Sequence, residues 1–103
     1  MLHNHIQLLI IPLIVGLTLL AVLEAITPVV DWPYLGLALG IEKYQLDIIE
    51  NENRGKVKDC KKAMISLWLD TADNTSWQCL VKALQSPLVE ETSLADDIAM
   101  KYL

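Results

Sequence analysis

The chain has 103 residues, of which 53% are hydrophobic, so it can form a single domain with one modest core and is too apolar to be disordered. Its formal net charge of −5 argues against a nucleic-acid-binding protein, because contacts to phosphates require a basic surface. The two cysteines, Cys60 and Cys79, fall within helical patterns and lack the spacing of metal ligands. We expect both to be buried, reduced thiols, which fits a cytosolic protein, and a disulfide or metal pair is the alternative.

The first segment of the chain contains an apolar run over residues 6–23. These 18 residues are slightly fewer than the about 20 that a helix needs to cross a bilayer. No Lys or Arg precedes Lys43, so the basic flank of a signal peptide or membrane anchor is missing. His3 and His5 have no cysteine or carboxylate nearby, and we do not expect them to bind a metal. We expect residues 1–16 to form an apolar helical extension, with a membrane segment as the alternative.

The second half of this run also has the pattern of a helix that faces a protein core. Apolar residues recur at helical spacing at Leu19, Val22, Leu23, Ile26 and Val30. The spacing predicts a helix that ends near Thr27-Pro28. We expect it to begin before Leu17 and to bend near Pro12 or Gly16, because Pro and Gly are common causes of helix kinks.

Residues 31–41 have the pattern of one short helix with clear boundaries. Asp31 is a suitable N-cap, and Pro33 falls in the first turn, where a missing N–H costs nothing. Gly36 allows a neighbouring backbone to come close, and Gly40 ends the helix as a residue with positive φ. The side that we expect to be buried contains Trp32, Leu35, Leu39 and Ile41. A helix this short is not stable alone, so its neighbours must pack against it.

Two further helices are expected at residues 42–50 and 56–70, separated by a turn at 51–55. The first should turn Leu46 and Ile49 inward, while Tyr44, Asp47 and Glu50 stay exposed. The expected buried face of the second contains Val57, Cys60, Met64, Leu67 and Trp68. Its other sides carry Lys58, Lys61, Lys62 and Ser66.

The last two helices follow a break at residues 71–75, where Asn74 or Thr75 can serve as the N-cap. The first of them should end at Ser86-Pro87, and the second should begin at Thr92 or Ser93. Their expected buried residues are Trp77, Leu80, Val81 and Leu84, followed by Leu94, Ala95, Ile98 and Tyr102. Six helices with short connections predict an all-α, six-helix antiparallel bundle. We expect a single core that contains Trp32, Leu35, Leu46, Ile49, Met64, Leu67, Trp77, Leu80 and Ile98.

The chain lacks the residue patterns of an enzyme, but its charges are unevenly distributed. Neither cysteine has a histidine partner, and no nucleotide-binding or zinc-binding motif is present, so we expect neither catalysis nor a cofactor. The basic segment contains Arg54, Lys56, Lys58, Lys61 and Lys62, and the acidic residues Asp47, Glu50 and Glu52 precede it. A second acidic group consists of Glu90, Glu91, Asp96 and Asp97. These charges form either an ordinary solvated surface or complementary patches for head-to-tail association.

Five motifs in order resemble a death domain. They are DWPYLGLALGI at 31–41, LDIIE at 46–50, DCKKAMISLWLD at 59–70, NTSWQCLVKAL at 74–84 and SLADDIAMKY at 93–102. The resemblance covers residues 17–103 and is most similar to death domains of larger invertebrate multidomain signalling proteins, whereas residues 1–16 have no place in the family pattern. It implies a six-helix bundle that acts as a non-catalytic adaptor, binding other death domains in apoptotic or innate-immune signal transduction.

The resemblance also implies where this domain would bind its partners. Death domains associate asymmetrically, through the first and fourth helices against the second and third, and through the third helix and the loop after it. Carried over to this chain, Lys58, Lys61 and Lys62 form the basic patch on the fourth helix, and Asp47, Glu50 and Glu52 form the acidic counterpart. We thus expect a cytoplasmic module that associates homotypically. The alternative is a small membrane-attached helical protein anchored by residues 6–23.

Overall fold

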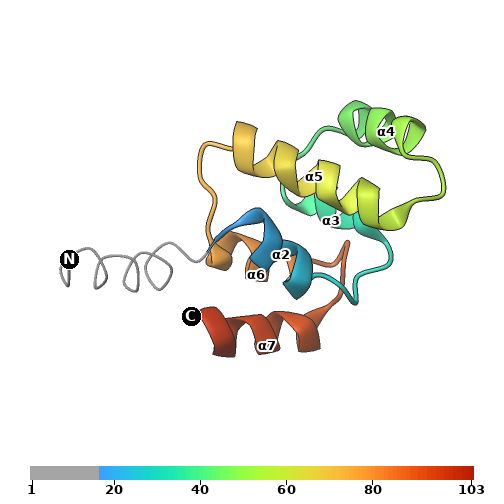
Figure 1. Ribbon diagram of the computed structural model, residues 1–103. Helices are drawn as coiled ribbons and strands as arrows, with labels where there is room; N and C mark the ends of the chain where they lie inside the picture. Colours follow the sequence, from blue (N-terminus) through green and yellow to red (C-terminus); the bar gives the residue numbers. More distant parts are fainter. Residues whose placement is uncertain (1–16) are drawn as a thin grey trace, which may run out of the picture.

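The computed structural model describes residues 17–103, and this part of the chain folds into six α-helices without strands (Figure 1). In chain order the helices are α2 (Leu19–Ala25), α3 (Trp32–Ala38), α4 (Lys43–Glu52), α5 (Val57–Thr71), α6 (Trp77–Gln85) and α7 (Thr92–Tyr102). The predicted all-α, six-helix bundle is confirmed for this part of the chain. The expected extension over residues 1–16 and the pair His3 and His5 lie outside the described residues.

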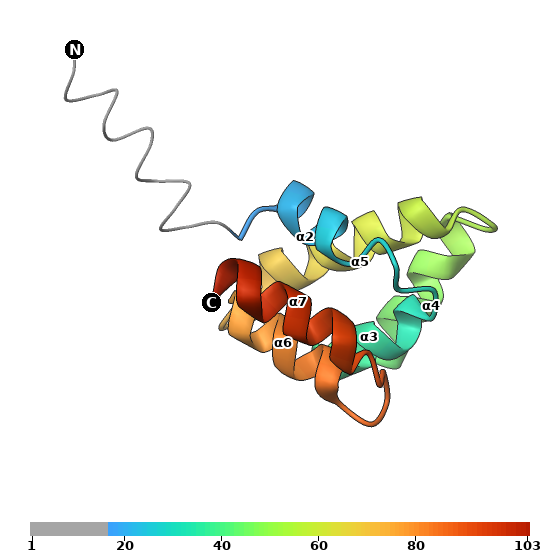
Figure 2. The same ribbon diagram turned by 90° about the horizontal axis from the view of Figure 1, so that it is seen from below.

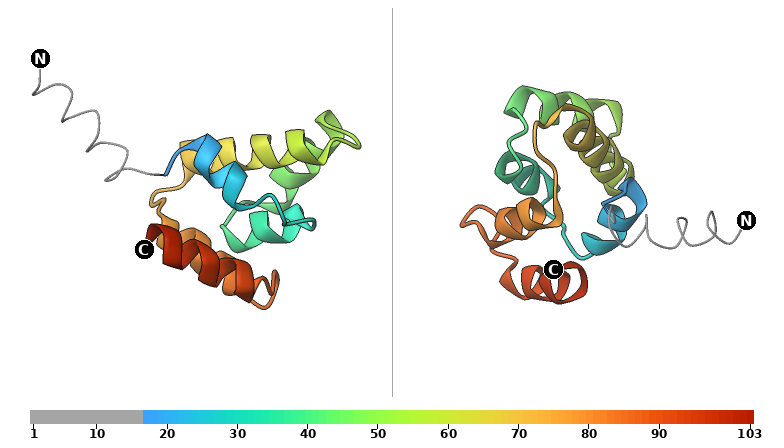
Figure 3. Two further views of the ribbon diagram at one scale, coloured as in Figure 1. Left: turned by 60° about the horizontal axis from the view of Figure 1, so that its bottom comes forward. Right: turned by 90° about the vertical axis from the view of Figure 1, so that its left-hand side faces the viewer.

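The longest helix, α5, has 15 residues and is contacted by most of the other helices. α2, α3 and α4 pack against it, and α3 packs in addition on α6 (Figure 1). α6 and α7 run side by side in opposite directions at the end of the bundle away from α4 (Figures 2 and 3). The core is therefore enclosed by α2 to α5 on one side and by the α6–α7 pair on the other.

The short helix α3 has the boundaries that its sequence predicts. Asp31 occupies the N-cap position, although its side chain makes no capping hydrogen bond, and Gly40 follows the helix with a φ of 92°. Gly36 is buried, and a Cβ atom at this position would lie 2.6 Å from Leu46 Cδ2 and 3.1 Å from Met64 Sδ. The absence of a side chain at Gly36 thus lets α3 approach α4 and α5 closely.

Eight of the nine residues that we expected in the core are buried, and Leu67 is the exception. Leu67 is half-buried at the edge between α4 and α5, where it lies near Ile48 and Ala63. The inward side of α5 is rotated toward Ile65, which is fully buried, so Leu67 falls outside the centre of that side. The predicted buried face with Leu67 is wrong because Ile65 and Leu67 flank the same stripe and helical spacing does not distinguish them.

Two valines that we expected to be buried are exposed instead. The exposed fraction is 75% for Val30 and 46% for Val57. Val30 lies in the connection between α2 and α3, where helical spacing no longer fixes the direction of a side chain. Val57 is the first residue of α5 and projects beyond the packed part of the helix. Both valines line the groove described in the next subsection.

Several helix boundaries differ from the predicted positions. α2 begins at Leu19, after Thr18 as its N-cap, and not before Leu17. α4 continues to Glu52, inside the predicted turn. The N-cap of α6 is Ser76 rather than Asn74 or Thr75, and its hydroxyl accepts a 3.1 Å hydrogen bond from the Cys79 N–H. The N-cap of α7 is Glu91, so Thr92 is already helical. Adjacent residues with similar capping side chains cannot be ranked without their backbone dihedrals.

The two cysteines are free thiols in different environments. Cys60 is buried, and its Sγ lies 3.6 Å from the carbonyl oxygen of Asn53. Burial raises the pKa of the Cys60 thiol, and the nearby carboxylates of Glu50 and Asp59 raise it further. Cys79 is only partly buried. The expectation of two buried thiols is therefore correct for Cys60 and wrong for Cys79.

This difference predicts selective labelling of Cys79 in the folded protein. Because the thiolate is the reactive form, iodoacetamide should alkylate Cys79 much faster than the buried Cys60 at mildly alkaline pH. Mass spectrometry of the time course measures the two rates, and a Cys79→Ser variant should lose the fast reaction. In denaturant both thiols should react at similar rates. Equal rates without denaturant would contradict the burial of Cys60.

Candidate interaction surface

The basic segment of α5 divides into exposed and buried lysines. Lys58 and Lys62 are exposed, one helical turn apart, and neither makes a hydrogen bond or an ion pair within residues 17–103. Like charges at i and i+4 slightly destabilise a helix, and no carboxylate within residues 17–103 compensates these two cations. Lys56 and Arg54 are also exposed in the connection before α5, where Arg54 Nη2 lies 3.4 Å from Asn51 Oδ1.

Lys61 does not lie on this exposed side, which corrects its expected position. Only 8% of Lys61 is exposed, and its Nζ donates hydrogen bonds to the carbonyl oxygens of Ile26 at 3.0 Å and Thr27 at 3.1 Å. Burial lowers the pKa of the Lys61 ammonium group below the usual value for a lysine. The spacing of apolar residues in α5 does not indicate this role, because a lysine gives no apolar signal.

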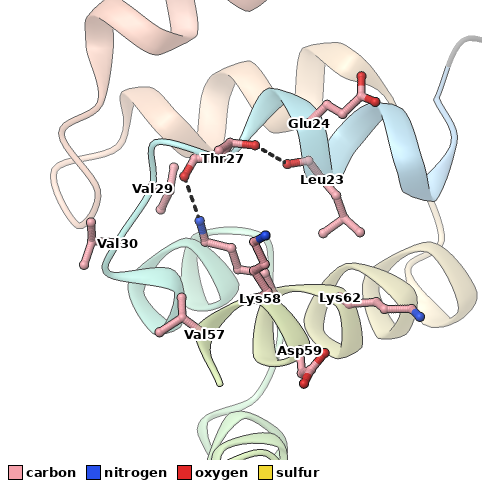
Figure 4. A pocket seen from close by; sticks show the side chains of 10 residues that line it. Leu23, Glu24, Thr27, Val29, Val30, Val57, Lys58, Asp59 and Lys62 are labelled. Carbon is pink, nitrogen blue, oxygen red and sulfur yellow. Dashed lines mark hydrogen bonds between the residues drawn. The ribbon is translucent and has the colours of Figure 1, made fainter. Parts of the chain in front are cut away.

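A groove of about 610 Å³ lies between α2, the connection after it, and the first half of α5 (Figure 4). Its apolar lining is formed by Leu23, Val29, Val30 and Val57. Figure 4 shows Leu23 pointing from α2 toward α5, whereas Glu24 and Asp59 point away from the gap between the two helices. Lys58 and Lys62 line the same groove on the α5 side. The groove therefore combines an apolar surface with two uncompensated cations.

The predicted acidic residues lie on α4 and are exposed. Asp47 pairs with Lys43 across one helical turn at 3.0 Å, while Glu50 and Glu52 make no ion pair within residues 17–103. The same helix exposes Tyr44 by 63% and Ile48 by 50%. Large apolar side chains at i and i+4 beside carboxylates give α4 an outer face that is both apolar and acidic. Of the second acidic group, Glu90, Asp96 and Asp97 are exposed and Glu91 is partly buried.

Two other types of site can be assessed for residues 17–103. No cluster of His, Cys, Asp and Glu in this part of the chain could hold a metal ion. None of its helices is both long enough and apolar enough to cross a membrane. The proposed anchor at residues 6–23 falls largely outside the described residues.

Comparison with known proteins agrees with the arrangement of the helices. The family model described as Death domain matches residues 17–97. This match includes α2 to α6 and the first half of α7. No curated protein and no solved structure matches the chain.

Proposed function

The chain belongs to the death-domain family, a family of protein–protein interaction modules in signalling, and we propose that it binds other death domains through asymmetric, charge-complementary contacts. The partners are copies of this chain or related domains. We place the protein in the cytoplasm as a non-catalytic adaptor in signalling of the apoptotic or innate-immune type.

The observation that carries this proposal is the pair of exposed, uncompensated lysines beside the groove. Within residues 17–103, Lys58 and Lys62 have no acidic partner. In the same part of the chain, Glu50 and Glu52 of α4 are exposed without a basic partner. Opposite charges on two surfaces of one domain favour encounter between copies and set their relative orientation. Lys61 is not included in this contact, because its ammonium group is occupied by backbone carbonyls.

The exposed apolar side chains near both charged surfaces favour a protein partner over a simple anion. Val30 and Val57 expose apolar surface at the groove, and Tyr44 and Ile48 expose apolar surface next to the acidic residues of α4. A single anion could neutralise the lysines but would leave the valines in water. A helix that presents both carboxylates and apolar side chains satisfies both parts of the groove.

A contact between the α5 side of one copy and α4 of another uses two different surfaces. Each added copy therefore leaves one groove and one α4 free, so association can continue as an open chain. We expect oligomers whose size increases with concentration, rather than a closed dimer.

Charge reversal tests the proposed contact. The double variant Lys58→Glu/Lys62→Glu should remain folded, because both side chains are exposed, and it should associate more weakly than the natural chain. The variant Glu50→Lys/Glu52→Lys should also associate weakly alone, but mixing the two variants should restore binding. Sedimentation at low and moderate salt measures the oligomers, and association of the natural chain should fall with added salt.

A matched control separates this contact from an effect of net charge. Lys82→Glu/Lys101→Glu changes the net charge by the same amount at exposed positions on α6 and α7. This control should associate like the natural chain. If Lys58→Glu/Lys62→Glu associates as strongly as the control, the basic pair is only a solvated surface and the proposal is wrong.

A further inference from the structure

Lys61 forms a link between two segments that are far apart in the sequence. Its Nζ lies 3.0 Å from the Ile26 oxygen and 3.1 Å from the Thr27 oxygen, although these residues precede it by 35 and 34 positions. Its neighbours Lys58 and Lys62 are exposed, whereas Lys61 is 8% exposed. No carboxylate within residues 17–103 pairs with Lys61, so its charge is compensated there by backbone carbonyls.

The position of these carbonyls explains why a lysine is suitable. Ile26 is the C-cap of α2, and the last carbonyls of a helix have no partner within the helix and carry partial negative charge. α2 has no basic residue in its last turn, so the cation comes from α5 instead. An ammonium group in this place satisfies two acceptors and complements the end of the helix dipole.

The segment held by Lys61 leads directly into one wall of the groove. Pro28, Val29 and Val30 follow Thr27 in the chain. We call these three residues the corner of the groove. Val29 is 3% exposed and packs in the core, whereas Val30 is 75% exposed. Figure 4 shows Thr27, Val29 and Val30 along one side of the groove, with Val57 on α5. Besides the core packing of Val29, the corner has short-range backbone hydrogen bonds such as Val29 N–H to Ile26 O at 2.9 Å.

We propose that Lys61 is a positioning residue, which fixes the corner at α5 and so keeps the groove in the shape that the partner domain binds. Lys61 does not contact the partner in this proposal. It acts through the position of Val29 and Val30 relative to Lys58 and Lys62. The inference rests on the proposed function for its effect on association, but its effect on the corner can be measured separately.

The test compares Lys61→Met with Lys61→Arg in the full chain. Methionine has a similar length but cannot donate to the two carbonyls, whereas a guanidinium group can donate to both. With Lys61→Met, the methyl NMR signals of Val29 and Val30 should shift while those of Leu80 and Leu84 in the distant core stay in place. Self-association, measured below the melting temperature, should weaken about tenfold. Lys61→Arg should recover most of the association, and Lys82→Met is the matched control on an exposed lysine.

A double-mutant cycle distinguishes positioning from a general loss of stability. If Lys61 acts through the groove, Lys61→Met should weaken association little further once Lys58 and Lys62 are glutamates. If Lys61→Met weakens association in that background as much as it does in the natural chain, the proposal is overturned. So would a shift of the valine signals with unchanged association. If Lys58→Glu/Lys62→Glu itself has no effect, the proposed function fails, and that result is distinct from a failure at Lys61.

Discussion

Replacing Met64 with alanine should lower the free energy of unfolding by about 2–5 kcal/mol, a large part of the stability of a small domain. Met64 is fully buried in α5, at the point where α3 and α4 approach this helix. Its Sδ lies 3.1 Å from the position that a Cβ on Gly36 would occupy, and Leu46 reaches the same point from α4. Since three helices meet there, they cannot all move in to fill the space left by the shorter side chain.

The control for this substitution is Leu67→Ala on the same helix. Leu67 is only half-buried, so the neighbouring side chains and water can fill its place and the loss should be smaller. Met64→Leu, which nearly keeps the side-chain volume, should cost less than about 1.5 kcal/mol. Urea denaturation followed by circular dichroism gives all three values. A larger loss for Leu67→Ala than for Met64→Ala would mean that the inward side of α5 is centred on the predicted face after all.

The helices of this fold are predictable because their signals are local. In α3, the position of Asp31, Pro33 and Gly40 defines both ends, and Gly36 marks the close approach of its neighbours. The apolar stripe of α6 predicts four of its five buried residues, all except Ala83, because helical spacing places these four on one face.

The candidate site is less predictable because it depends on contacts between distant segments. The groove is built from residues 23–30 and 57–62, and no pattern within either segment predicts that they meet. Lys61 shows the same limit: as a charged residue among other lysines it is typical of an exposed position, and only the nearby end of α2 makes its burial favourable. Lys58 and Lys62 are exposed as predicted.

Replacing Trp77 with alanine is expected to be about as severe as the loss of Met64, at about 3–5 kcal/mol. The Trp77 ring is 7% exposed and stacks on the Tyr102 ring, with centroids 3.7 Å apart and planes inclined by 5°. This stack joins the start of α6 to the end of α7, while Ala95 and Ile98 hold the rest of α7. In the Trp77→Ala variant we expect the last turns of α7 to open. Hydrogen exchange would detect this opening as faster amide exchange in α7 than in α4.

Trp77→Phe separates the aromatic contact from the indole N–H. The Trp77 Nε1 atom is buried and has no hydrogen-bond partner within residues 17–103, so phenylalanine removes a donor without breaking a bond. A buried, unsatisfied donor costs about 1–3 kcal/mol, which offsets part of the apolar area that the smaller ring loses. Trp77→Phe should therefore destabilise the domain much less than Trp77→Ala and should keep α7 protected from exchange. If the two substitutions cost the same, Nε1 must have a partner, and the stack with Tyr102 contributes little to holding α7.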